Sequence, residues 1–408
     1  KRSLLKLLIL LSVIAVLTVM TISVCSSPEP AAPAETEAPA ATEAPADEPA
    51  DEPAEPADEP AEVQTLDIGF YADGADSYYQ VMVDTMVAAA NEDPETDWTV
   101  DYKIGQNTAA EQLQAVEDFI TAGYDAIVVI QNSVDTTSEC ITKTEAAGVP
   151  YFGAAHGFVD APNSQDAAGS VHFNFVQAGI YAGEDAVARG VEKVIMIEGQ
   201  LGQGSASAQT YGYFKAFEDA GKSLGGVTAE ELAANKTEAS QDGTQEIEVV
   251  FWASGGWFSD PAQRAMTDAI TSLGVDGFDA VYAQNNPMME GVLFAFEEAG
   301  LDPSNYHLSS CNGREISWEW VADGIVTIDV NQSAALEGIV LYQQVKAYFN
   351  GEEYRKYVHP YLTPYNVDNI QDVALVPFSD VDAFMAGRAA GDFVTDLNDP
   401  KFTDIEGY

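Results

Sequence analysis

Short apolar runs alternate with longer amphipathic segments along the chain from about residue 65 onward. Residues 126–130 are five consecutive apolar residues, a pattern typical of a strand that is buried on both faces. Residues 109–122 place apolar side chains three positions apart, as one face of a helix requires. Residues 133–147 also have a helical pattern, and Gly148 then follows, a residue type that commonly ends helices. Strands that alternate with helices predict right-handed βαβ units and a parallel sheet covered on both faces.

This rhythm occurs twice, so we expect two lobes of similar size. The expected strands are 66–71, 98–104, 126–130, 149–154, 193–198, 246–252, 280–283, 307–310 and 325–330. The expected helices are 79–90, 109–122, 133–147, 175–188, 206–220, 261–273, 287–299, 316–322 and 334–349. The polar stretch 221–245 is interpreted as an insertion or a helical excursion. The predicted fold class is α/β, with two doubly wound parallel-sheet lobes.

The first 25 residues have the pattern of an export signal. Three basic residues, the last of them Lys6, precede an uncharged run at 7–24, which is the order found in signal peptides. An uncleaved membrane anchor and a simple secreted form are the alternatives, because about 18 apolar residues just span a bilayer. The residues Ile-Ser-Val-Cys that end at Cys25 resemble the lipobox of bacterial lipoproteins. We expect a lipoprotein signal peptide at 1–25, acylation of Cys25, and an exported, membrane-anchored protein.

Residues 26–64 are expected to form a disordered tether. From residue 28 to residue 62 the segment contains only Ala, Pro, Glu, Asp and Thr. None of these side chains is large and apolar enough to build a core, and proline together with like charges favours an extended chain. The tether would hold the folded body away from the membrane lipid.

Charge and composition exclude several classes of function. The chain has 408 residues, 46% of them hydrophobic, and its 17 basic and 66 acidic residues give a net charge of -49. Such a surface repels phosphate groups, so we expect no nucleic-acid partner and no contact with the membrane beyond the lipid. Three cysteines and four histidines without metal-binding spacing predict no metal site. No Gly-x-Ser-x-Gly or His-Glu-x-x-His motif is present, so we expect neither an enzyme nor a cofactor.

Amide and aromatic side chains recur directly after the expected strands. Tyr78 and Tyr79 follow the first strand, Trp257 follows the strand at 246–252, and 284–286 is Gln-Asn-Asn. Ligands of such sheets bind at the carboxyl ends of the strands. Amides bind hydroxyl groups and aromatic rings suit the C–H face of a sugar, although Asn and Asp also favour loops and caps for local reasons. Together these residues predict a polyol site.

Several segments occur in an order that is specific to one family. They are 66–70 with 77–79, 123–127, 147–150, Ala-Val-Tyr-Ala-Gln-Asn-Asn-Pro-Met at 280–288, and 362–367. From residue 65 to about 370, the chain resembles the type I periplasmic solute-binding proteins of sugar ABC transporters, the ribose- and galactose-binding group. The resemblance implies an N-terminal lobe of 65–173 plus 333–362 and a C-terminal lobe of 174–332 plus 363–408. It also implies a three-crossing hinge near 172–174, 329–332 and 360–365.

The resemblance further implies a set of ligand-binding residues. Carried over by position, they are Asp76, Tyr78, Tyr79, His156, Asn174, Gln209, Trp257, Asn285, Asn312 and Gln332. Ribose-like members have arginine where His156 and Gln209 stand, and aspartate where Ala155, Asn174 and Asn312 stand. The loss of these charges argues for a neutral ligand, because an acidic ligand favours an arginine fork.

The function that follows is capture of a neutral sugar or polyol outside the cytoplasmic membrane. Closure of the lobes around the ligand would present it to the transmembrane subunits of an ABC permease, with the binding protein acting as a monomer. A ligand-sensing receptor subunit for chemotaxis or a sensor kinase is the alternative, because it would share the fold and the pocket. A related DNA-binding repressor is disfavoured by the export signal and the acidity.

Overall fold

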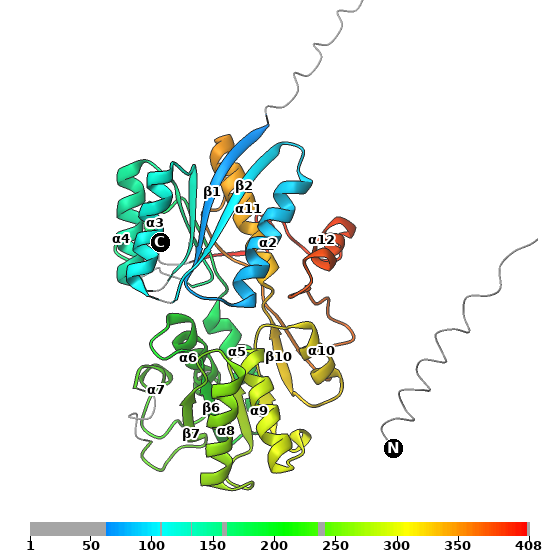
Figure 1. Cartoon of the computed structure of the whole chain (residues 1–408). Helices are drawn as coiled ribbons and strands as arrows, with labels where there is room; N and C mark the ends of the chain where they lie inside the picture. The colour runs from blue at the N-terminus through cyan, green and yellow to red at the C-terminus, as the bar shows by residue number, and fades with distance from the viewer. Residues whose placement is uncertain (1–62, 107, 132, 157–160, 236–240, 406–408) are drawn as a thin grey trace, which may run out of the picture. The chain divides into compact units, whose positions relative to one another are not determined.

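The computed structural model describes residues 63–106, 108–131, 133–156, 161–235 and 241–405 (Figure 1). The expected signal peptide with Cys25, and the expected tether up to residue 62, lie outside the described residues. None of the helices in this described part is long and apolar enough to cross a membrane. Two α/β lobes form the body of the chain, each around its own sheet, as the sequence predicts.

The first lobe contains, within the described residues, a seven-stranded sheet in the order β13-β11-β5-β4-β3-β1-β2. Its strands are β1 (Gln64–Ala72), β2 (Thr96–Ile104), β3 (Ala126–Ile130), β4 (Tyr151–Ala154), β5 (Gly169–Val171), β11 (Tyr357–His359) and β13 (Thr403–Asp404). Its helices are α2 (Ser77–Glu92), α3 (Ala109–Ala122), α4 (Val134–Ala147), α11 (Ala334–Asn350) and α12 (Val381–Ala390). Helices α2, α11 and α12 share one core, whereas α3 and α4 cover the other face.

The second lobe contains, in the described part, a six-stranded sheet in the order β12-β10-β9-β8-β6-β7. Its strands are β6 (Lys193–Glu198), β7 (Glu248–Ser254), β8 (Ala280–Ala283), β9 (His307–Ser309), β10 (Ile328–Asn331) and β12 (Thr363–Asn366). Its helices are α5 (Phe175–Ala188), α6 (Gly204–Asp219), α7 (Ala229–Asn235), α8 (Ser259–Leu273), α9 (Asn286–Ala299) and α10 (Glu315–Ala322). Strand pairs are parallel except β12 with β10 here and β13 with β11 in the first lobe.

Local sequence signals explain where the helices next to the sheet ends begin. The Asp76 carboxylate accepts a hydrogen bond from the Tyr78 amide at 2.8 Å and caps α2. The Asn285 side chain accepts from the Met288 amide at 2.9 Å and caps α9. Such caps satisfy amide groups that a helix cannot pair internally. Because both helices start directly after a strand, their first residues lie at the carboxyl ends of the two sheets.

The described chain passes between the lobes four times. Three passages join β5 to α5, β10 to α11, and β11 to β12, close to the predicted hinge segments. The fourth passage follows β12, where Val373 and Leu375 still pack on the second-lobe core and Val376 and Phe378 lie in the first-lobe core. The tail therefore adds a crossing to the hinge that the sequence predicts.

The assignment of 363–408 to the second lobe needs a correction: from Val376 to the last described residue, the tail packs on the first lobe. Phe384, Leu397 and Phe402 are buried in the core of the first lobe, and β13 pairs with β11 at the edge of its sheet. Apolar side chains of the tail share one core with those of α2 and α11, and burial of this apolar surface holds the tail there.

Hydrogen bonds fasten the fourth crossing to the second crossing and to the start of α10. The Asn331 side chain donates to the Val376 carbonyl at 3.0 Å and accepts from the Val376 amide at 2.8 Å. The Glu315 carboxylate accepts from the amides of Phe378 and Ser379 at 2.8 and 2.9 Å. These bonds fix where the tail enters the first lobe and hold Phe378 beside the cleft described next.

Candidate functional site

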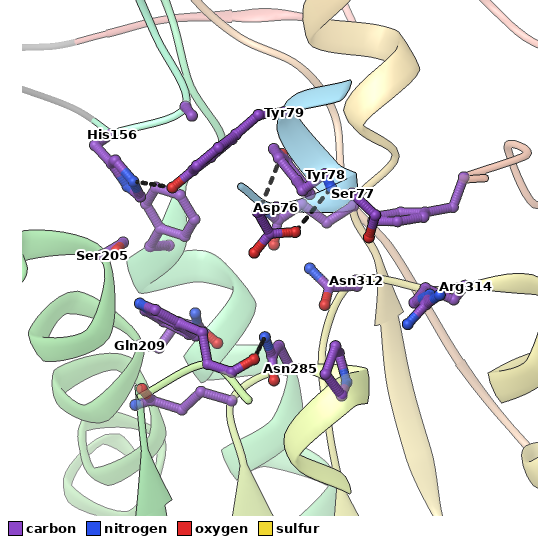
Figure 2. Close-up of a pocket in the computed structure, with 17 residues that line it drawn as sticks. Asp76, Ser77, Tyr78, Tyr79, His156, Ser205, Gln209, Asn285, Asn312 and Arg314 are labelled. Atoms are coloured by element: carbon purple, nitrogen blue, oxygen red, sulfur yellow. Dashed lines mark hydrogen bonds between the residues drawn. The ribbon is translucent and has the colours of Figure 1, made fainter. Parts of the chain in front are cut away.

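A cleft lies where the carboxyl ends of strands from both lobes meet (Figure 2). Its cavity measures about 610 Å³, a volume that includes the open mouth. Side chains from both lobes, the hinge and the tail line it. They are Asp76, Ser77, Tyr78, Tyr79, Ala155, His156, Phe175, Ser205, Gln209, Trp257, Gln284, Asn285, Pro287, Asn312, Arg314, Gln332 and Phe378.

Nine of the ten residues that the sequence predicts for the site line this cleft. They are Asp76, Tyr78, Tyr79, His156, Gln209, Trp257, Asn285, Asn312 and Gln332. Asn174 does not line the cleft, which corrects its predicted place among the ligand-binding residues. Its side chain accepts a hydrogen bond from the Gln177 amide at 3.0 Å and caps α5, a local role that short polar side chains often take.

The two tyrosines at the start of α2 are held by different partners. The Tyr78 hydroxyl donates to the Glu337 carboxylate at 2.9 Å and accepts from the Gln332 amide at 3.2 Å. The Tyr79 hydroxyl forms a hydrogen bond with the His156 Nε2 at 2.9 Å. The two rings stand at 90° to each other. A single helix start thus presents two fixed aromatic surfaces to the cleft.

Hydrogen bonds and close packing hold Trp257 in place at the cleft wall. Its Nε1 donates to the Gln203 side chain at 2.6 Å, and its carbonyl accepts from the Asn285 side chain at 3.1 Å. The ring packs so tightly against Gly199 that a Cβ there would lie 2.2 Å from ring atom Cζ2. The indole is therefore a rigid platform at the cleft wall rather than a free side chain.

Unusual backbone conformations gather at this cleft. Among the described residues, the non-glycine residues with positive φ are Ala155 at 64°, Trp257 at 73° and Asn312 at 104°. All of them line the cleft. Positive φ is unfavourable for side chains with a Cβ and persists where the surroundings impose it. Such strain is concentrated at binding and active sites, so it supports this cleft as the functional site.

Two buried amides behind the cleft hold its wall in place. Gln284 accepts from the Gly199 amide at 2.9 Å and donates to Thr210 at 2.8 Å. The Asn286 side chain accepts from the Arg314 backbone amide at 2.8 Å. The Asn286 backbone amide donates to the Asn312 side chain at 3.2 Å. Buried amides that are fully paired in this way rigidify a site.

Sequence reasoning missed several lining residues. Arg314 follows Asn312 and Gly313 at a strand end, so its position after β9 was the available signal. Gln284 belongs to the Gln-Asn-Asn stretch at 284–286, and Ser205 lies at the start of α6, the helix that follows β6, but neither was selected for the site. No signal pointed to Phe378, because the resemblance ends near residue 370 and the tail arrives by tertiary packing.

Burial shifts the titration of the groups around the cleft. Burial raises the pKa of Glu337 to about 8. Burial also raises the pKa of Asp73 to about 7, although a hydrogen bond from Tyr79 lowers it. Burial lowers the pKa of His156 to about 4, so its imidazole is neutral at pH 7. Within the described chain, no group of three or more His, Cys, Asp or Glu side chains is arranged to hold a metal ion.

The fold and the cleft define a two-lobed binding protein with its ligand site between the lobes. Residues 68–353 match the family model described as the periplasmic binding protein domain. The chain belongs to this family, which has the type I fold and consists of extracytoplasmic binding proteins.

Two curated relatives share part of the sequence. The xylitol-binding protein of Mycolicibacterium smegmatis is 26% identical over 267 residues, covering 64% of this chain and 68% of that protein. The putative rhizopine-binding protein of Rhizobium meliloti is 24% identical, covering 57% of this chain and 68% of that protein.

Solved structures share the fold. A galactofuranose-binding protein superposes with a TM-score of 0.63 at 18% identity, covering 80% of this chain and 100% of that chain. An ABC transporter solute-binding protein from Bacillus halodurans with bound myo-inositol gives 0.62 at 20% identity, covering 76% and 97%. At such identities the similarity establishes the fold.

Proposed function

We propose that this protein captures a neutral sugar or polyol by closing its two lobes and delivers it to the permease of an ABC importer. The observation that carries the proposal is the cleft, in which aromatic rings and amide groups from both lobes surround one cavity. The names of the relatives support the same ligand class, since one binds xylitol and a neighbour of the same fold holds myo-inositol.

The lining groups match the chemistry of a polyol. The rings of Tyr78, Tyr79 and Trp257 offer apolar faces for C–H groups, and a stacked ring adds about 0.5–1.5 kcal/mol beyond its burial. The Asn285 side chain accepts one hydrogen bond from the Met288 backbone amide and donates one to the Trp257 carbonyl. The Asn312 side chain accepts one from the Asn286 backbone amide. An amide has two N–H groups and two acceptor positions, so each of them retains capacity for a hydroxyl group.

Closure follows from the placement of these groups. The tyrosines belong to the first lobe, Trp257 and Asn285 belong to the second, and Gln332 lies at the second crossing. A ligand that contacts both lobes binds the closed form more strongly, and it therefore shifts the equilibrium toward closure. The closed monomer is then the form that docks on the transmembrane subunits of the permease.

A sensory role is the second candidate. The fructose-binding periplasmic domain of a hybrid two-component system has the same fold, with a TM-score of 0.62 at 16% identity. Both roles need the same cleft, so ligand binding alone does not separate them. Stimulation of ATP hydrolysis by the reconstituted permease supports import, whereas stimulation of a kinase alone supports sensing.

We further propose that the body is tethered outside the cytoplasmic membrane by a lipid on Cys25. The support is the sequence of the export signal and the lipobox-like residues before Cys25. Incorporation of labelled palmitate in cells should be lost in Cys25→Ser. Equal labelling of both proteins would contradict lipidation at this residue.

A thermal-shift screen tests the ligand class. At a ligand concentration of about a thousand times Kd, binding stabilises the native state by about 4 kcal/mol. With an unfolding entropy of about 2.1 cal/mol/K per residue, a body of roughly 340 residues should melt about 6 °C higher. We expect this shift with at least one neutral monosaccharide or polyol. A response only to amino acids or inorganic anions would contradict the proposal.

A further inference from the structure

The tail contributes an aromatic side chain to the cleft. Phe378 lines the cavity, and its side chain is otherwise buried in the core of the first lobe. The matched family domain covers residues 68–353, so Phe378 lies in a segment beyond it. The Phe378 ring stands against the Tyr78 ring, with 5.6 Å between the ring centroids and 56° between the ring planes. One wall of the cleft is therefore completed by a part of the chain outside the matched domain.

Phe378 ends a row of aromatic rings along the first-lobe side of the cleft. Tyr78 contacts Tyr79 with 6.2 Å between the ring centroids, and Tyr79 contacts the His156 ring with 6.1 Å. All four rings line the cavity. The Tyr78 hydroxyl is already engaged in two hydrogen bonds. Tyr78 and Phe378 therefore offer mainly carbon surface at their end of the row, which suits the C–H groups of a ligand.

The backbone on either side of the ring is held by the second lobe and the second crossing. One carboxylate oxygen of Glu315 accepts from the amides of Phe378 and Ser379 at 2.8 and 2.9 Å. Hydrogen bonds to a charged acceptor are roughly twice as strong as those between neutral groups. The Pro377 carbonyl accepts from the Ser333 hydroxyl. The ring is fixed as a result, because it cannot leave the cleft wall without breaking these contacts.

We propose that Phe378 contacts the bound ligand, so that the tail is a working part of the ligand site and not only a brace on the first lobe. This inference rests on the proposed function and adds to it a binding residue that neither the sequence pattern nor the matched domain assigns. A ligand enclosed between the lobes meets Phe378 because the cavity reaches this ring. A fixed ring loses little freedom of movement when a ligand binds, so the contact contributes efficiently to affinity.

Calorimetric titration of the purified protein tests the contact. The probes are xylitol, myo-inositol, D-ribose, D-xylose, D-glucose, D-galactose and D-fucose. Phe378→Leu keeps an apolar side chain in the core but removes the ring from the cleft wall. For each probe that the wild type binds, we expect this variant to bind about threefold to tenfold more weakly, as the loss of one ring contact predicts.

Phe384→Leu is the matched control. Phe384 belongs to the same tail and is buried in the same core, but it does not line the cleft. The control therefore suffers the same substitution and a similar loss of packing, and it should bind the probes as the wild type does.

A second measurement separates direct contact from an effect through Tyr78. In protein with isotope-labelled phenylalanine rings, nuclear Overhauser effects should connect C–H protons of the bound probe to a ring signal that is missing in Phe378→Leu. If Phe378→Leu does not fold, Phe378→Met replaces it in both measurements, because an unbranched methionine fills irregular core spaces well.

The outcomes distinguish this inference from the proposed function. Wild-type affinity in Phe378→Leu, an equal loss in Phe384→Leu, or a bound probe without a contact to the Phe378 ring would overturn the inference and leave a sugar-binding function standing. Silence of the wild-type protein toward every probe would overturn the proposed function and this inference with it.

Discussion

Replacing Glu337 with glutamine should remove a large part of the pH dependence of stability. The Glu337 side chain is fully buried behind the cleft, and it accepts the hydrogen bond of Tyr78. Burial raises its pKa from 4.5 to about 8. The folded state therefore binds more protons than the unfolded state between these values, so stability falls as the pH rises through this window.

The magnitude follows from the shift. Each pKa unit corresponds to about 1.4 kcal/mol, so the whole shift amounts to roughly 5 kcal/mol. About 3–4 kcal/mol of this loss falls between pH 5 and pH 8. With an unfolding entropy of roughly 0.7 kcal/mol/K for a body of this size, the melting temperature should fall by about 5 °C over that range because of Glu337 alone.

Calorimetric melting of the wild type and Glu337→Gln at pH 5, 6.5 and 8 measures this effect. Glutamine copies the shape of the neutral acid, so the variant should lose about 5 °C less than the wild type between pH 5 and pH 8. Asp73 remains in both proteins and contributes equally to both. Glu290→Gln, an exposed position on α9, should keep the wild-type profile. Identical profiles for Glu337→Gln and the wild type would refute the reasoning.

Three further substitutions test the cleft and the tail. Trp257→Ala should weaken sugar binding about tenfold, measured by calorimetry, because it removes a stacked ring together with its burial. Gly199→Ala should weaken binding comparably, since its Cβ would displace the Trp257 ring. Asn331→Ala should lower the melting temperature by about 4 °C, because three buried hydrogen bonds worth about 1 kcal/mol each are lost.

Each of these changes has a control. Trp257→Phe should retain most of the affinity for the sugar. In Gly204→Ala the added Cβ points into open space, so this variant should bind the sugar as the wild type does. Asn305→Ala lies at an exposed site and should melt as the wild type does. Wild-type affinity in Gly199→Ala would show that packing does not position the indole. An unchanged melting temperature in Asn331→Ala would show that the tail is held by its apolar side chains alone.

The sequence predicts most of the fold because its signals are local. Five apolar residues at Ala126–Ile130 form a strand that is buried along its whole length, and Gly148 ends α4 in the left-handed conformation. The strand β5 (Gly169–Val171) escaped prediction because its residues Gly, Ser and Val do not form an apolar run. Its pairing with β4 and β11 defines it as a strand.

The site was predictable where it depends on strand order and unpredictable where it depends on distant packing. Tyr79 and Asn312 follow strands, and parallel strands bring their carboxyl ends together. Asn174 also follows a strand, yet it does not line the cleft. Phe378 reaches the cleft from a tail that packs on the first lobe, and no local pattern encodes that contact.

The route of the tail predicts an order of folding. The second lobe is built from one long stretch, from Phe175 to Asn331, and the short strand β12. The first lobe combines segments from the start, the middle and the last described residues of the chain, so many of its contacts are distant in sequence. Distant contacts form slowly, and a chain synthesised from its N-terminus makes the tail last. Pulse-labelled hydrogen exchange should therefore find β6 and β8 protected before β11 and β13, with the first lobe still accessible to chaperones and proteases in the interval.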